Sequence, residues 1–145
     1  DQDDDYDMLD DIVHECAHAV ENSNSYDLYS DGKIENEFLS KRNKLEIYLK
    51  HEGYPVDEYN FQNAQYDSNL DSFFMHEVGY EKLRNLSNGI FLSAYSAVSL
   101  REYFAIGFEE YYLRDKDIVR KTCPRVFEKL TLVNNDRLGE YSEDL

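Results

Sequence analysis

A short segment, His14-Glu15-Cys16-Ala17-His18, contains the residue types that hold a catalytic metal ion. Residues four apart on an α-helix are turned by about 40° from each other, so both imidazoles project from one face and reach a single zinc ion at about 2.0–2.1 Å. Glu15 lies on the neighbouring flank, where its carboxylate can accept a proton from metal-bound water. The spacing therefore predicts Zn²⁺ held by His14 and His18, with Glu15 as general base.

The third ligand is not fixed by the spacing. A catalytic zinc ion usually has three protein ligands and keeps one position for water. The candidate carboxylates downstream are Glu35, Glu37 and Glu102. Glu37 stands at about the interval that thermolysin-like enzymes use for their glutamate, so it competes with Glu102, and the residues alone leave these three open.

Helices must position these side chains. Apolar residues from Met8 to Val20 recur at helical spacing, which predicts a helix whose apolar face, Cys16 included, points away from the histidines into a core. Ser99 followed by Glu102 forms a capping box and predicts the start of a strongly aromatic helix. Helices are expected at 8–20, 34–51, 71–85, 100–113, 117–121 and 124–132.

Segments between and beyond these helices are polar. Residues 1–7 are expected to form an acidic tail and residues 134–145 a polar tail, which leaves one domain at 8–133. Residues 53–70 are expected to be irregular. Residues 90–98 are mixed, and either a short strand or a loop presenting Tyr95 fits them.

Composition limits the classes of partner. The chain has 145 residues with 41% hydrophobic content, enough for one modest core, and its formal net charge of −16 repels phosphate and anionic lipid. We therefore expect no nucleic-acid partner. No apolar run approaches the ~20 residues of a membrane span. Two cysteines leave the redox compartment open, and we expect a secreted or virion-associated protein rather than a cytoplasmic one.

The segment His14-Glu15-Cys16-Ala17-His18-Ala19-Val20 resembles the active-site helix of the anthrax lethal factor-like metallopeptidases, a group that includes the Pro-Pro endopeptidases. Later blocks resemble that family in the same order, and together they cover about residues 14–130. These blocks are Leu45-Glu46-Ile47-Tyr48-Leu49-Lys50-His51-Glu52-Gly53, Glu102-Tyr103-Phe104-Ala105-Ile106-Gly107-Phe108 and Thr122-Cys123-Pro124-Arg125-Val126-Phe127.

This resemblance implies a mainly α, zincin-like catalytic half-domain. It implies that Glu102 is the third zinc ligand, and that Tyr95, seven residues before it, stabilises the oxyanion of the tetrahedral intermediate. The implied function is hydrolysis of peptide bonds by a zinc metallopeptidase, with a peptide or protein as substrate.

The chain departs from the family pattern at several positions. Cys16 and Ala17 replace a bulky residue and a glycine, and Glu21 stands where the family often has aspartate. Ile106 replaces a glutamate in the third-ligand helix, which predicts the loss of a hydrogen bond to a zinc histidine. Residues near 54–88 are expected to be an insertion.

Zincins place a substrate-binding sheet before the active-site helix, and here that sheet is expected to be short or absent. A second hypothesis follows from this expectation. The chain is then a catalytically silent, zincin-fold structural or interaction protein with protein partners in an assembly, for example a component of a virion or toxin.

Overall fold

The protein is mainly α-helical, as the sequence predicts. The computed structural model describes the backbone of residues 2–143 and the side chains of residues 7–135, and this part of the chain contains no β-strand. No helix within residues 2–143 combines the length and the apolar character needed to cross a membrane.

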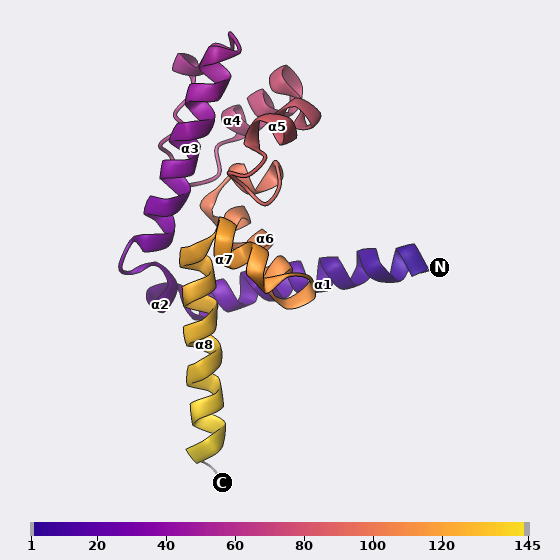
Figure 1. Ribbon diagram of the computed structural model, residues 1–145, viewed down its shortest axis with the longest axis vertical. Helices are drawn as coiled ribbons and strands as arrows, with labels where there is room; N and C mark the ends of the chain where they lie inside the picture. The colour runs from indigo at the N-terminus through magenta and orange to yellow at the C-terminus, as the bar shows by residue number, and fades with distance from the viewer. Residues whose placement is uncertain (1, 144–145) are drawn as a thin grey trace.

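Eight α-helices and three short helical segments follow one another along the described chain (Figure 1). In that figure α1 projects to one side, and α3 and α8 extend in opposite directions from the middle. The helix α6 lies centrally and contacts α1, α3, α7 and α8. The elements are α1 (Gln2–Ser23), α2 (Ser25–Tyr29), α3 (Lys33–His51), η1 (Val56–Glu58), α4 (Ser68–Ser72), η2 (Phe73–Val78), α5 (Tyr80–Ser87), η3 (Tyr95–Ala97), α6 (Leu100–Leu113), α7 (Lys116–Thr122) and α8 (Pro124–Glu143).

Helix α6 begins where the capping box predicts. The Ser99 hydroxyl accepts a hydrogen bond from the backbone N–H of Glu102 at 3.2 Å, which satisfies one of the free amides of the first turn. Close packing holds the helix against α8, because a Cβ on Gly107 would lie only 3.0 Å from Val126 Cγ1. Its buried side chains are Tyr103, Phe104, Ala105, Phe108 and Tyr111.

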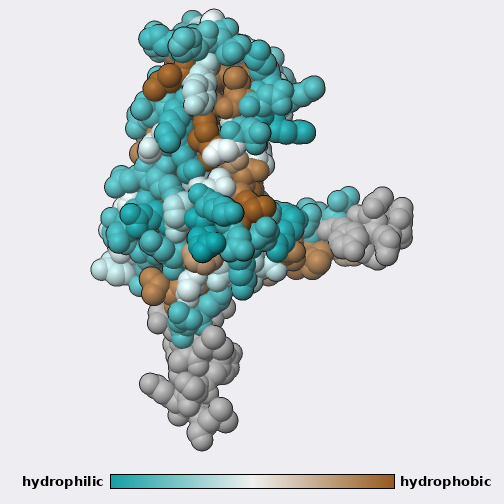
Figure 2. All heavy atoms as spheres, viewed as in Figure 1, coloured by the Kyte–Doolittle hydropathy of each residue, from teal (hydrophilic) through white to brown (hydrophobic). Residues whose placement is uncertain are grey.

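The apolar face expected on α1 is only partly buried. Ala17 is fully buried, but Met8, Leu9 and Ile12 are 57%, 45% and 54% exposed. Cys16, expected in the core, is also exposed. The N-terminal part of α1 projects away from the other helices (Figure 1), although Arg114 reaches Asp10 there. Figure 2 shows hydrophobic residues at the surface of α1.

Both ends of the chain are more helical than expected. Helix α1 begins at Gln2 rather than Met8, and α8 continues to Glu143. The sequence predicts solvated tails at residues 1–7 and 134–145. Most of their side chains lie outside the described residues.

The region expected as an insertion folds against α3. The single helix expected at 71–85 is divided, because Gly79 has φ +82°, which ends the π-helical η2 and begins α5. Residues 53–70 are largely irregular, as expected, with the short η1 and the start of α4. An aromatic cluster fills this region, in which the rings of Tyr59 and Phe73 lie 4.4 Å apart.

Arg42 on α3 is the largest fully buried side chain. Its guanidinium donates hydrogen bonds to the carbonyl oxygens of Phe61 (3.1 Å), Asn63 (3.2 Å), Val98 (2.7 Å) and Ala97. Burial lowers the pKa of Arg42 to about 10, so it stays charged at neutral pH. One side chain thus ties two separate loops to α3.

We expect the Arg42→Met variant to lose roughly 3–5 kcal/mol of unfolding free energy, because four carbonyl acceptors would be left without donors. Urea unfolding followed by circular dichroism measures this loss. Lys44→Met, at an exposed position of the same helix, is the matched control and should change stability by less than about 0.5 kcal/mol. Equal midpoints for the two variants would contradict the role given to Arg42.

Candidate metal centre

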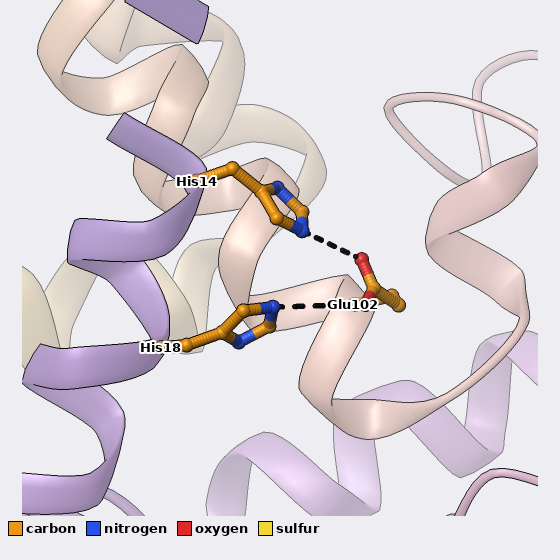
Figure 3. Close-up of side chains that lie close together, drawn as sticks. All are labelled: His14, His18 and Glu102. Carbon is orange, nitrogen blue, oxygen red and sulfur yellow. Dashed lines mark ion pairs between the residues drawn. The ribbon is translucent and has the colours of Figure 1, made fainter. Parts of the chain in front are cut away.

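Three side chains from two helices point toward one another (Figure 3). His14 and His18 lie on α1, one turn apart, and Glu102 lies in the first turn of α6. His14 Nε2 is 3.1 Å from Glu102 Oε2, and His18 Nε2 is 3.7 Å from Glu102 Oε1. All three side chains are partly buried, with exposed fractions of 14–27%.

This arrangement fits a divalent metal ion. Two ligand atoms at about 2.05 Å from a tetrahedral ion lie about 3.3 Å apart. The two nitrogen–oxygen distances, which involve different oxygens of Glu102, are 3.1 and 3.7 Å. One ligand atom from each residue lies within 4.8 Å of the others. Glu102 Oε2 is buried and has no hydrogen-bond partner, and a bound cation would satisfy it. A two-histidine, one-carboxylate set suits zinc with an open position for water.

The two other predicted site residues are not part of this group. Glu15 is exposed on α1, next to His14. Tyr95 on η3 lines a cavity of about 340 Å³ together with His14, Ile106 and Glu109. Desolvation raises the pKa of Tyr95, and the charge of Glu102 adds to the effect, so the phenol is held in its protonated form.

The rival carboxylates lie elsewhere. Glu37 accepts a hydrogen bond from the backbone N–H of Arg125 (3.3 Å) near the start of α8, and it is not part of the histidine group. Burial raises the pKa of Glu37. Glu35 lines a separate cavity of about 620 Å³ that also touches Glu102. Of the three carboxylates that spacing left open, the structure brings Glu102 to the histidines.

The outer nitrogens of the two histidines have different partners. Arg101 Nε donates a hydrogen bond to His18 Nδ1 at 3.1 Å, and the same nitrogen lies 3.5 Å from the Glu21 carboxylate. Glu21 is only 8% exposed and accepts a hydrogen bond from the Tyr29 hydroxyl. Glu21 therefore takes part in a polar network beside His18 that is only partly buried, because the Arg101 side chain is exposed.

His14 Nδ1 contacts the carboxylate of Glu109, a residue that sequence reasoning missed. A signal was present in the chain, because Glu109 follows Glu102 by seven residues, which is about two helical turns on the same face of α6. This spacing identifies Glu109 as a partner of His14 only when α1 is known to pack against that face of α6.

The chain matches no model of a known protein family, no curated protein and no solved structure.

We expect purified protein to bind about one zinc ion per chain and the Glu102→Gln variant to lose it on dialysis, because the amide removes the anionic donor. Glu37→Gln is the matched control and should retain the metal. Elemental analysis by mass spectrometry measures both. Loss of zinc in the Glu37 variant alone would contradict the assignment.

The control also has a stability signature. Because burial raises the pKa of Glu37 in the folded protein, its protonated carboxyl stabilises the fold at low pH. This contribution is lost as pH rises from the pKa of the unfolded state through the pKa of the folded state. Glu37→Gln should therefore be more stable than the wild type at neutral pH, with the difference shrinking below the unfolded pKa.

Proposed function

We propose that this chain is a zincin-like metallopeptidase domain, resembling the lethal factor-like peptidases, that hydrolyses peptide bonds at a zinc site formed by His14, His18 and Glu102. The supporting observation is the convergence of two imidazole nitrogens from α1 and a buried carboxylate from α6 within 4.8 Å. The order HExxH followed by a distant glutamate suits this chemistry.

A zinc ion bound there would polarise the scissile carbonyl and lower the pKa of its water toward ~7. Glu15, next to His14 and open to solvent, accepts the proton of the attacking water and returns it to the leaving amine. Tyr95 donates its phenolic hydrogen to the developing oxyanion, a role that needs the protonated form favoured by its raised pKa.

The Glu15→Gln variant is expected to lose peptide cleavage while keeping its zinc, because the amide cannot accept the proton and Glu15 is not in the ligand group. A library of fluorescence-quenched peptides measures cleavage, and elemental analysis measures zinc. In the same assay Tyr95→Phe should lower kcat by about 10²-fold, as the loss of one oxyanion donor does.

Glu81→Gln is a matched control for this experiment. It removes one exposed carboxylate from α5, outside the metal centre, and should leave cleavage unchanged. Undiminished cleavage by the Glu15 variant would contradict the proposed role of Glu15. Absence of cleavage by the zinc-loaded wild type would contradict peptidase function.

A second candidate function is a catalytically silent interaction protein in an assembly. The observation that favours it is the exposed apolar surface of α1, where Met8, Leu9 and Ile12 are about half exposed. Exposed apolar clusters of this kind are typical of protein-binding surfaces. In this case zinc would serve to hold α1 against α6.

Chelation distinguishes the two functions. For the peptidase, removal of zinc should lower the melting temperature but leave a cooperative transition and the helical circular dichroism spectrum, because the aromatic core around α6 and α3 does not include the site. Collapse of the melting transition on chelation would instead indicate a structural metal site.

A further inference from the structure

The ring of His14 is held between two carboxylates of the same helix. Its Nε2 faces Glu102, and its Nδ1 contacts Glu109 Oε1. A neutral imidazole has one donor nitrogen and one acceptor nitrogen. If Nε2 binds a metal, Nδ1 must carry the hydrogen, and a carboxylate is an acceptor that holds this tautomer in place.

Helix geometry explains how one helix supplies both groups. Glu109 lies about 10.5 Å along α6 from Glu102 and is turned by only about 20° from it, so the two carboxylates lie on one face with His14 between them. Ile106 lies on the same face and lines the same cavity as His14 and Glu109. The isoleucine at 106 predicts that His14 lacks a carboxylate partner. Glu109, three residues later, supplies that partner to His14 Nδ1.

The Glu109 carboxylate is itself fixed. Its second oxygen lies 3.8 Å from Arg114 Nη2, while Arg114 Nη1 lies 3.3 Å from Asp10 on α1. Asp10 precedes His14 by one helical turn, so Arg114 joins the end of α6 to the same stretch of α1 that carries the histidine. Glu109 is only 14% exposed, which limits its freedom to turn away.

We propose that Glu109 is the positioning residue for His14. It selects the tautomer with hydrogen on Nδ1, aims Nε2 at the metal position, and replaces the acid that Ile106 does not provide. This inference rests on the metal centre of the proposed function. The two histidines have unequal surroundings, since His18 Nδ1 accepts a hydrogen bond from Arg101 Nε. To bind a metal through Nε2, His18 would have to give up this hydrogen bond and carry its hydrogen on Nδ1.

The test compares zinc affinity of the wild type, Glu109→Gln, Glu110→Gln and Glu102→Gln, measured by competition with a chromophoric chelator. Glu110 is a matched control, because it is the next residue on α6 and also pairs with Arg114 (2.9 Å). We expect Glu109→Gln to weaken zinc binding by about 10–100-fold, and Glu110→Gln to change it by less than about 3-fold, within the range of a remote charge.

Two further measurements separate positioning from a general loss of structure. The metal-free forms of both variants should have similar urea midpoints. In the zinc-loaded wild type and the Glu110 variant, the Nδ1 proton of His14 should give a slowly exchanging NMR signal, and in the Glu109 variant this signal should broaden or disappear. The absorption bands of the cobalt-substituted protein should shift only in the Glu109 variant.

Equal zinc affinities for the Glu109 and Glu110 variants, with Glu102→Gln unable to bind, would overturn the role of Glu109 and leave the metal centre intact. Equal binding by the wild type and Glu102→Gln, or no binding by the wild type, would overturn the metal centre and this inference with it.

Discussion

A guanidinium group removed from water must find acceptors inside the protein, and Arg42 finds four main-chain carbonyls on two loops. One loop, around Phe61, belongs to the region that folds against α3. The other, at 97–98, lies two residues after Tyr95 and leads directly into α6. The first turn of α6, with Glu102, is therefore placed relative to α3 by this interaction, and Tyr95 is placed with it. Half of the candidate site depends on a residue that takes no part in its chemistry.

The other half depends on how α1 crosses α6. Ala17 on α1 is fully buried, and acidic side chains of α6 contact His14 on the same helix. Glu21, Glu102 and Glu109 are each at most 16% exposed, while Arg101 and Arg114 provide the opposing cations. A cation held by His14, His18 and Glu102 would add positive charge to this acidic surrounding.

Patterns among neighbouring residues predicted the helices that carry the site. The features that these patterns did not predict depend on contacts between residues far apart in the sequence. The helical spacing of His14 and His18, the capping box at Ser99 and the end of α3 each depend on neighbouring residues, so the sequence shows them directly. Periodicity shows which side of a helix is apolar, but not whether another element covers it, and for this reason Met8 and Ile12 were wrongly expected in a core. The spacing also left Glu35, Glu37 and Glu102 open, because the choice depends on how helices far apart in the sequence meet.

Position 106 shows how a motif can mislead when it is compared letter by letter. An isoleucine there predicts a missing hydrogen bond, yet the requirement is an acceptor facing His14 Nδ1, not an acid at a given place in the sequence. Glu109 reaches His14 Nδ1 from the face of α6 that also carries Glu102. A side chain seven residues along the same helix can therefore supply the acceptor. Only the contact between α1 and α6, which no local spacing reveals, identifies that side chain.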